Sequence, residues 1–234
     1  MVVNLKDVSI EFNNKEITGV IDKDNILYKE SIKDELNNNK YLISYINYKD
    51  FLTKTISDEF YLSKHITKDK DNYIEKIVSC LEMVGLSSDY LEKDIPTLSN
   101  SEKILLELAT SLITNPDVII FNNIFNNLDR KNKQLIKKIL LELKKKYEKT
   151  IIIIDNNINI LYEMCTSLVI FENNNLLIYD KVSNVFKDID FLIDNNIEIP
   201  DLIKFSLIAG GYGKKINYYN NINDLIKDVY RNAR

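Results

Sequence analysis

The 234-residue sequence predicts an α/β fold, with a parallel sheet, helices packed on it and a small helical appendage at the C-terminal end. Segments typical of strands and helices alternate from residue 118 to residue 171, as in βαβ units. Within this stretch, Thr150–Ile154 is an unbroken β-branched run, typical of a parallel strand covered on both faces. Beyond about residue 183 the pattern becomes helical. We therefore expect a core over residues 1–182 and a helical extension over residues 183–234.

The N-terminal third is expected to hold short elements. Strands are predicted at residues 3–12, 15–21 and 41–46, and helices at residues 26–36 and 55–62. Asn13-Asn14 is a suitable hairpin turn between the first two strands. Ser57 is the expected N-cap of the second helix, because a serine hydroxyl accepts a hydrogen bond from the first helical turn.

The rest of the core alternates between longer helices and strands. Helices are predicted at 71–84, 99–113, 130–147 and 158–164, and strands at 118–121, 150–154, 167–171 and 176–179. In the first of these helices the apolar residues share one face, and Gly85 follows where a helix end favours glycine. In the extension we expect helices at 183–194, 200–209 and 222–231, with a Gly-Gly-Tyr-Gly break at 210–213.

The composition narrows the classes of function. The net charge is −4 without a basic block, which disfavours nucleic-acid binding. No run approaches the ~20 apolar residues that span a bilayer, and the N-terminus does not resemble a signal peptide. Cys80 and Cys165 fall in apolar helical patterns, as expected of reduced core cysteines. These features predict a cytoplasmic chain and allow it only a peripheral role at a membrane.

The stretch from Thr97 to Asp129 is the most informative part of the sequence. It contains a capped amphipathic helix, a turn at Asn115-Pro116, a buried strand at Val118–Phe121 and a polar loop ending in Leu128-Asp129. This layout resembles the core of ATP-binding cassette (ABC) ATPases. In that family a helix opening with LSGGQ leads to an apolar strand ending in Asp-Glu and then to a loop ending in Leu-Asp. The resemblance implies the P-loop NTPase fold of those enzymes.

Three further segments resemble the ATPase subunits of energy-coupling-factor (ECF) importers. They are TISDEFYL at 55–62, VSNVFKD at 182–188 and the C-terminal tail at 191–229. The resemblance also shows a departure, because residues 22–40 are too few for the loop, full helix and small β-insert that the family places there. We therefore expect an ABC ATPase fold with a reduced N-terminal β part and an ECF-type C-terminal extension.

The phosphate-binding loop of the family is missing from the sequence. ABC ATPases place G-x-x-x-x-G-K-[ST] after their first long strand, so that backbone N–H groups converge on the phosphates. Here the matching strand, Ile17–Ile21, is followed by Asp-Lys-Asp-Asn-Ile-Leu, and no glycine occurs between Gly19 and Gly85. Without glycine such a close backbone approach is strained. The two aspartates also add negative charge where a triphosphate would sit.

The catalytic positions of the family carry different residues as well. Asn122 stands where the family has its Mg²⁺-orienting Asp, and Asn123 where it has its general-base Glu. An amide accepts no proton near neutral pH, so Asn123 cannot act as a general base. Asn156, within Asp155-Asn156-Asn157, takes the place of the switch His, and Asn47–Phe51 replaces the loop that carries a Gln. We therefore predict no catalytic residue and no metal site, and regard Asn122 and Asn123 as the polar end of a strand.

The helix that opens this stretch has two interpretations. In one, Ser99, Asn100, Ser101 and Glu102 face a nucleotide held by a partner ATPase, since Ser99 is the retained residue of LSGGQ. Against this, Asn100 and Ser101 replace glycines that allow close approach, and Glu102 adds a carboxylate. In the favoured interpretation Ser99 and Glu102 form a capping box. Asp129 matches the Asp of the family's loop at the dimer interface, and it can equally cap the helix that follows it.

A retained fold pattern with lost chemistry predicts a catalytically inactive ABC-type subunit, a pseudoenzyme, of an ECF-type importer. The resemblance implies that it pairs with an active ATPase subunit and a membrane coupling protein, and that it is peripheral on the inner face of the cell membrane, which it contacts only through a partner. ATP and Mg²⁺ would be held by the partner, with no cofactor of its own. The alternative is a soluble homodimeric scaffold without a transport role. A residual hydrolase is disfavoured, because the sequence has a single histidine, His65, and no Ser-His-Asp set.

Overall fold

A six-stranded sheet forms the centre of the computed structural model, which describes residues 2–5, 8–13, 15–22, 41–48, 51–64, 72–172 and 175–232. The strand order is β4-β5-β6-β3-β7-β8, with the first five strands parallel and β8 antiparallel to β7. The strands are β3 Ile17–Asp22, β4 Ile43–Ile46, β5 Val118–Asn122, β6 Thr150–Ile154, β7 Ser167–Glu172 and β8 Asn175–Lys181. The α/β fold with a parallel sheet is therefore confirmed.

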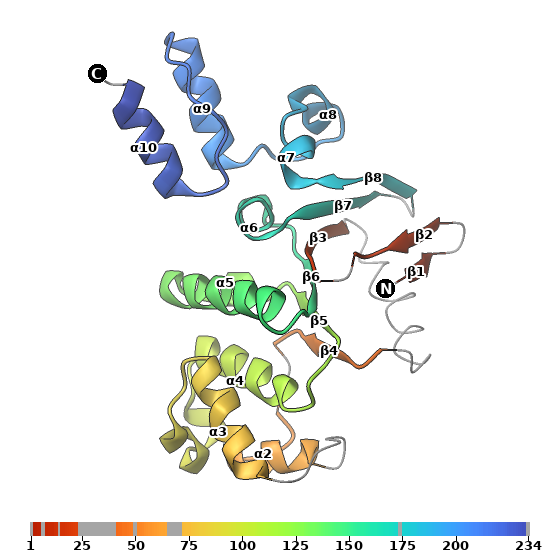
Figure 1. Cartoon of the computed structure of the whole chain (residues 1–234), viewed down its shortest axis with the longest axis vertical. Helices are drawn as coiled ribbons and strands as arrows, with labels where there is room; N and C mark the ends of the chain where they lie inside the picture. Colours follow the sequence, from red (N-terminus) through yellow and green to blue (C-terminus); the bar gives the residue numbers. More distant parts are fainter. Residues whose placement is uncertain are drawn as a thin grey trace.

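Helices cover one face of this sheet (Figure 1). They are α2 Ile56–Ser63, α3 Tyr73–Met83, α4 Asn100–Leu112, α5 Arg130–Lys145 and α6 Ile158–Met164. Along β6, Ile151 and Ile153 belong to the apolar cluster beneath the helices, whereas Ile152 and Ile154 belong to a smaller cluster on the opposite face. This explains why the β-branched run is continuous, since a strand buried on both faces needs apolar residues at every position.

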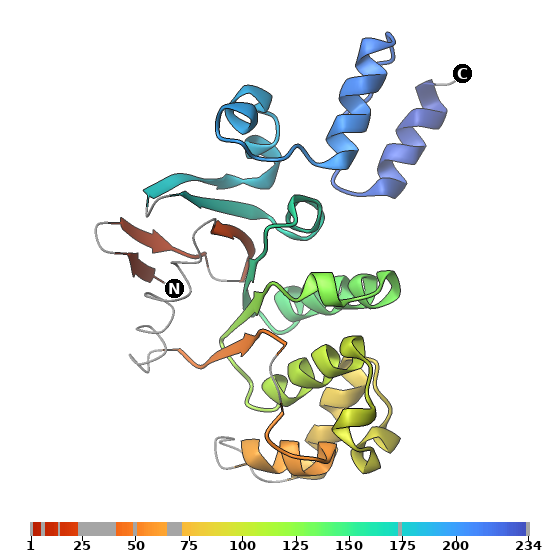
Figure 2. The ribbon, with the colours of Figure 1, turned by 180° about the vertical axis from the view of Figure 1, so that it is seen from behind.

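The predicted hairpin between residues 3–12 and 15–21 is wrong. The first run forms two strands, β1 Val2–Leu5 and β2 Val8–Glu11, which pair with each other in a separate two-stranded sheet. In Figures 1 and 2 they lie on the side of the main sheet away from the helices. β3 instead pairs in parallel with β6 and β7, and all six of its residues are buried. The polar pair Lys6-Asp7, which interrupts the first apolar run in the sequence, was the missed signal.

The helix ends follow local capping chemistry. Thr55, not the predicted Ser57, caps α2, because the Thr55 hydroxyl accepts a hydrogen bond from the Asp58 N–H. Gly85 follows α3 with a φ of +80°, as expected of a glycine at a helix end. The predicted helix over 26–36 lies outside the described residues. None of the helices in the described ranges has the length and apolar character needed to cross a membrane.

The C-terminal helices α7–α10 differ from the prediction in two places. They span Val182–Val185, Ile189–Asp194, Asp201–Gly211 and Ile222–Asn232. The predicted helix over 183–194 is divided into α7 and α8, because the Asp188 carboxylate caps a new helix by accepting from the Phe191 N–H. The glycine break is displaced as well: Gly210 and Gly211 lie within α9, and the left-handed glycine is Gly213, with a φ of +74°.

The start of α9 is fastened to α6 by two hydrogen bonds. The side chain of Asn159 donates to the Asp201 carboxylate (2.9 Å) and accepts from the Asp201 backbone N–H (2.8 Å). The reciprocal pair fixes where the chain leaves the core. It thereby positions α9 and α10, which run side by side at one end of the molecule (Figures 1 and 2).

Candidate functional site

The carboxyl ends of β3, β5 and β6 lie side by side and bring the sequence-predicted residues together. β5 pairs with β6 so that Asn122 lies opposite Ile154, and β3 pairs with β6 so that Val20 lies opposite the same residue. Asp22, Asn122 and Asp155 therefore stand at neighbouring strand ends. Ligands of parallel α/β sheets bind at this edge, so we call it the carboxyl edge and regard it as the candidate functional site.

Asn122 and Asn123 form an amide pair at the end of β5. The Asn123 side-chain amide donates to the Asn122 side-chain oxygen at 2.9 Å. The Asn123 backbone has a φ of 52°, in the left-handed region that asparagine tolerates better than most residues. Its N–H donates to the Ile154 carbonyl oxygen at 2.9 Å, which holds the turn on β6. This strand therefore ends in two neutral amides joined by one hydrogen bond, and no carboxylate stands there.

Asp155 is the unexpected group at the end of β6. Its side chain is 1% exposed, one carboxylate oxygen accepts from the Asn157 N–H at 2.8 Å, and the other has no hydrogen-bond partner in the described part of the chain. Burial raises the pKa of Asp155. Asn156, at the expected place of the switch residue, is exposed, whereas Asn157 caps α6 by accepting from the Asn159 N–H. The residues therefore share a loop but have different roles.

The predicted capping box at the start of α4 is present. The Ser99 hydroxyl oxygen accepts from the Glu102 N–H at 3.3 Å, and the Ser99 N–H donates to the Glu102 carboxylate at 2.8 Å. A hydrogen bond from the Tyr90 hydroxyl and bonds from Ser99 lower the pKa of Glu102 to about 2. Glu102 is thus ionised at neutral pH, and an anionic group occupies the first turn of α4.

Asn100 and Ser101 do not share one surface, which corrects the expectation that both crowd a partner-facing side. Asn100 is exposed and its side-chain oxygen accepts from the Tyr48 hydroxyl at 2.6 Å. Ser101 is buried, and its hydroxyl lies 3.4 Å from both the carboxylate and the N–H of Asp129. Ser101 therefore joins α4 to the loop that ends at Asp129, because its side chain is directed into the molecule.

Asp129 caps α5, as the second of its two predicted roles requires. Its carboxylate accepts from the backbone N–H and the side-chain amide of Asn132, both at 2.8 Å. The bond from the Asn132 backbone N–H is the main cause that lowers the pKa of Asp129. Its role at a dimer interface remains a prediction.

Two buried glutamates of the site region were missed by sequence reasoning. Glu107 of α4 is 2% exposed and accepts from the backbone N–H groups of Asn47 and Tyr48, at 3.2 and 3.0 Å. Glu59 of α2 similarly accepts from the N–H groups of Leu52 and Thr53. Glu107 thus holds Asn47 and Tyr48 to α4, and Glu59 holds Leu52 and Thr53 to α2. The sequence feature that could have revealed these two glutamates is a carboxylate on the apolar face of an amphipathic helix.

We predict that Glu102 makes the stability of the fold fall in acid. Its folded-state pKa of about 2 lies below the ordinary value of 4.5, so the unfolded chain binds the proton more readily. The stabilisation is present above the ordinary value and is lost as the pH falls towards 2. In urea unfolding, the Glu102→Gln variant should therefore lose less stability than the wild type as the pH falls from about 5 to 2. Parallel stability profiles of the two proteins would contradict this.

Ser99→Ala should lower the free energy of unfolding by about 1 kcal/mol at pH 7, because the first turn of α4 loses its cap.

Several sequence-predicted positions cannot be placed. Residues 23–27 after β3, His65, and two residues within Asn47–Phe51 lie outside the described residues. Asp22 is described and buried at the end of β3. Within the described ranges, no group of three His, Cys, Asp or Glu side chains has the arrangement of a metal site.

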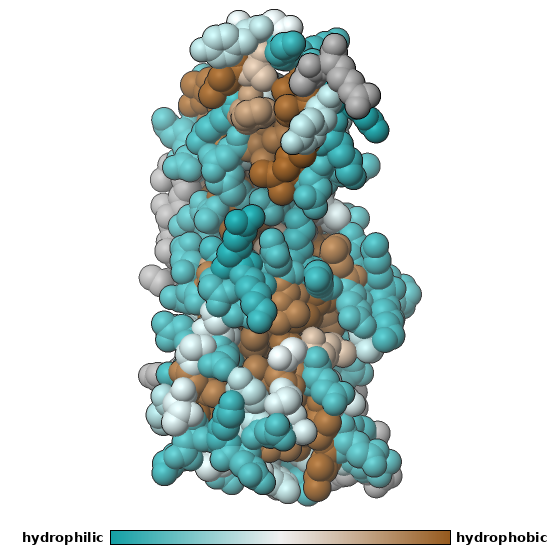
Figure 3. Space-filling model, turned by 90° about the vertical axis from the view of Figure 1, so that its left-hand side faces the viewer, coloured by the Kyte–Doolittle hydropathy of each residue, from teal (hydrophilic) through white to brown (hydrophobic). Residues whose placement is uncertain are grey.

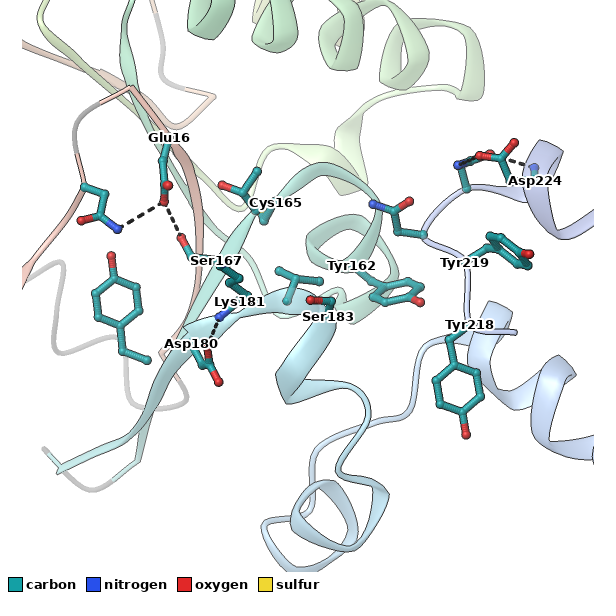
Figure 4. Close-up of a pocket in the computed structure, with 16 residues that line it drawn as sticks. Glu16, Tyr162, Cys165, Ser167, Asp180, Lys181, Ser183, Tyr218, Tyr219 and Asp224 are labelled. Atoms are coloured by element: carbon teal, nitrogen blue, oxygen red, sulfur yellow. Dashed lines mark hydrogen bonds between the residues drawn. The ribbon is translucent and has the colours of Figure 1, made fainter. Parts of the chain in front are cut away.

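A cavity of about 770 Å³ lies at the opposite, amino edge of the sheet, between β3, β7, β8 and the connection from α9 to α10. Figure 4 shows Glu16 and Ser167 on the core side and Tyr218, Tyr219 and Asp224 on the side of the C-terminal helices. Its charged residues are Glu16, Asp180, Asp224 and Lys181, so carboxylates predominate. This charge does not suit a triphosphate, and the cavity is not a substitute for a nucleotide site.

Comparison with curated proteins finds related sequences among ECF ATP-binding proteins. EcfA of Malacoplasma penetrans is 26% identical over 179 residues, which cover 76% of this chain and 62% of that protein. EcfA1 of Mycoplasmoides gallisepticum is 27% identical over 180 residues, with 76% and 63% covered. The chain thus spans less than two thirds of the length of these relatives. No protein-family model matches it.

Comparison with solved structures finds ABC cassettes. The structure of cbiO1 from Clostridium perfringens, part of the ABC transporter complex cbiONQ, superimposes with a TM-score of 0.66. The match covers 83% of this chain and 91% of that one, at 15% identity, and so shows the fold alone. Together, the sequence relatives and the shared fold identify the chain as a homologue of ABC ATPases that is related to the ATP-binding proteins of ECF transporters.

Proposed function

We propose that the chain is a non-hydrolysing ABC-type subunit of an ECF-type importer and works beside an active ATPase chain. The observation that carries this proposal is the amide pair of Asn122 and Asn123 at the end of β5. Neutral amide oxygens are weaker ligands for Mg²⁺ than carboxylates, and they do not accept a proton from water at neutral pH. General-base catalysis contributes about 10²–10⁴-fold to a rate, so its loss removes most of a slow hydrolytic turnover.

The sequence after β3 supports the same proposal. A phosphate cradle requires glycines at positions where backbone N–H groups approach the phosphates, and the chain has none from residue 20 to residue 84. Restoring acids at the end of β5 would therefore not restore hydrolysis. The chemistry is deficient at two separate strand ends, β3 and β5.

In the proposed pair, the start of α4 and Asp129 contact the partner ATPase. Glu102 places an ionised carboxylate in the first turn of α4, and Asn100 is engaged by the Tyr48 hydroxyl. A carboxylate at the start of the helix repels the phosphate groups of a nucleotide. We therefore assign this surface to protein–protein contact, with ATP and Mg²⁺ held by the partner's own residues.

A separate exposed surface suits the membrane subunit. Leu52, in the segment between β4 and α2, is 86% exposed, and Tyr61 and Leu62 of α2 are also exposed. Glu59 holds the backbone of Leu52 and Thr53 in place, so Leu52 is presented from a fixed loop. We assign these apolar side chains to contact with a polytopic coupling protein, through which the chain would sit at the membrane.

The test is purification of the full chain, alone and co-expressed with the ATPase and membrane subunits of an ECF importer from the same organism. The chain alone should neither bind nor hydrolyse Mg·ATP, and it should co-purify with the membrane subunit. Leu52→Asp should abolish co-purification, whereas Ile193→Asp, at an exposed site on α8, should not. Micromolar Mg·ATP binding by the chain alone would overturn the proposal.

A homodimeric scaffold without a transport role is the second candidate, and one surface favours it. Phe205 and Ile208 of α9 and Ile226 and Tyr230 of α10 are exposed, and apolar atoms gather at this end of the molecule in Figure 3. Contiguous exposed apolar surface marks protein interfaces. A stable homodimer in light scattering, unchanged by co-expression with ECF subunits, would favour the scaffold over the transport role.

A further inference from the structure

A second cavity lies at the amino edge of the sheet, away from the carboxyl edge. It has a volume of about 520 Å³ and lies between α3, the last turn of α4, the end of α5 and the segments that lead into β5 and β6. Cavities of about 300–1,000 Å³ are the usual size of small-molecule sites. The residues that line it come from three helices and from the segments that lead into the sheet, so its shape is set by the packing of the helices on the sheet.

The wall of this cavity is mainly apolar. It is formed by Cys80 and Met83 of α3, Leu112 of α4 and Leu143 of α5. Burial raises the pKa of the Cys80 thiol to about 11, so this side chain stays neutral and behaves as a small apolar group. Such a wall is suited to an alkyl chain, which gains by leaving water.

A lysine stands beside this wall. The Lys149 ammonium group donates to the Asn115 side-chain oxygen at 2.7 Å, and within the described part of the chain it forms no ion pair. Burial lowers the pKa of Lys149, while the nearby charge of Asp117 acts in the opposite direction. The Asp117 carboxylate accepts from the Leu42 N–H at 2.9 Å and is already engaged. Lys149 therefore has donor capacity left for an anion.

We propose that this cavity binds an alkyl carboxylate, with the chain against the apolar wall and the carboxylate on Lys149. Among the charged residues that line the cavity, Lys149 is the one whose hydrogen-bond partner in the described part of the chain is a neutral amide. A single-headed anion complements the charge of this lysine, and a cation does not. A hydrogen bond between two ionised groups is stronger than a bond to a neutral amide, so a carboxylate is a better partner for Lys149 than the Asn115 side chain is.

The position of the cavity gives the site a connection to the carboxyl edge. α4 begins beside Ser99 and Asn100 and ends at Leu112, which lines the cavity. A bound alkyl chain would thus contact the last turn of the helix whose first turn belongs to the proposed partner surface. The binding proposal itself rests on the cavity alone and does not require the transport role.

The test is calorimetric titration of the full chain with decanoate, and with decanol and decylammonium as neutral and cationic probes. Decanoate should bind saturably and decylammonium should not. Lys149→Met should weaken decanoate binding by roughly 10- to 100-fold, the range for a lost hydrogen bond between charged groups, and leave decanol binding nearly unchanged. The matched control is Lys145→Met, at an exposed lysine on α5.

Leu112→Phe supplies a second variant, because a larger side chain fills part of the cavity while Lys149 itself is unchanged. It should weaken both decanoate and decanol. Two results would overturn the proposal: no saturable decanoate binding by the wild-type chain, or equal decanoate affinity for the wild type and a folded Lys149→Met variant. Since Lys149 is half-buried at the rim, this variant is expected to fold even if Leu112→Phe does not.

Discussion

Replacing Phe125 by alanine is expected to lower the free energy of unfolding by about 3–5 kcal/mol, the usual cost of removing a buried phenyl ring. Phe125 is fully buried in the 3-10 turn Phe125–Asn127 that follows β5, with its ring centroid 6.4 Å from that of Phe121. This turn connects the amide pair to Asp129. The substitution therefore leaves a cavity beneath the loop that follows β5 at the carboxyl edge.

Urea unfolding followed by circular dichroism measures this loss. The matched control is Phe205→Ala on α9, where the ring is 47% exposed and the change should stay within about 0.5 kcal/mol. Equal effects of the two substitutions would show that the turn is not anchored by Phe125. Hydrogen exchange should further show faster exchange at residues 122–129 in Phe125→Ala, because the turn loses its anchor.

The fold could be predicted from the sequence where apolar periodicity and helix capping alone determine the ends of an element. The strand Thr150–Ile154 and the helix Ile158–Met164 have the predicted ends, since a β-branched run and an asparagine N-cap leave little choice. The hairpin was mispredicted because local turn chemistry was given more weight than burial. Every residue of β3 is buried, and such a strand takes a central place in a sheet rather than in an exposed hairpin.

The site was predictable only in part, because several of its contacts join distant segments. The capping box of Ser99 and Glu102 spans four residues and could be recognised locally. The bond of Ser101 to Asp129 spans 28 residues, and that of Tyr48 to Asn100 spans 52. No spacing rule links such residues. Asp155 was missed for another reason: its burial depends on the helices packed over β6, which sequence alone does not place.

Replacing Glu107 by alanine is expected to lower the free energy of unfolding by about 2–4 kcal/mol, the second large effect that the structure predicts. The Glu107 carboxylate is buried and accepts from two backbone N–H groups, those of Asn47 and Tyr48. Asn47 and Tyr48 are exposed, so water can replace the lost acceptor in part, and the cost is set mainly by the two hydrogen bonds to a charged acceptor, about 1.5–3 kcal/mol each at most. Glu107→Gln keeps one oxygen acceptor and should lose less, whereas Glu142→Ala, at an exposed glutamate of α5, should change little.

The same substitution tests whether α4 positions the segment after β4. Without Glu107, only the Tyr48–Asn100 bond would hold residues 47 and 48 to α4 among the side-chain bonds described here. Amide exchange at these residues should then accelerate more than exchange at β5, although both adjoin β4 in the fold. If exchange rose equally at both, the loss would be global unfolding and not release of the segment. Suppose that exchange accelerates selectively and that less membrane subunit co-purifies. Glu107 would then couple α4, which faces the proposed ATPase partner, to the exposed surface at Leu52.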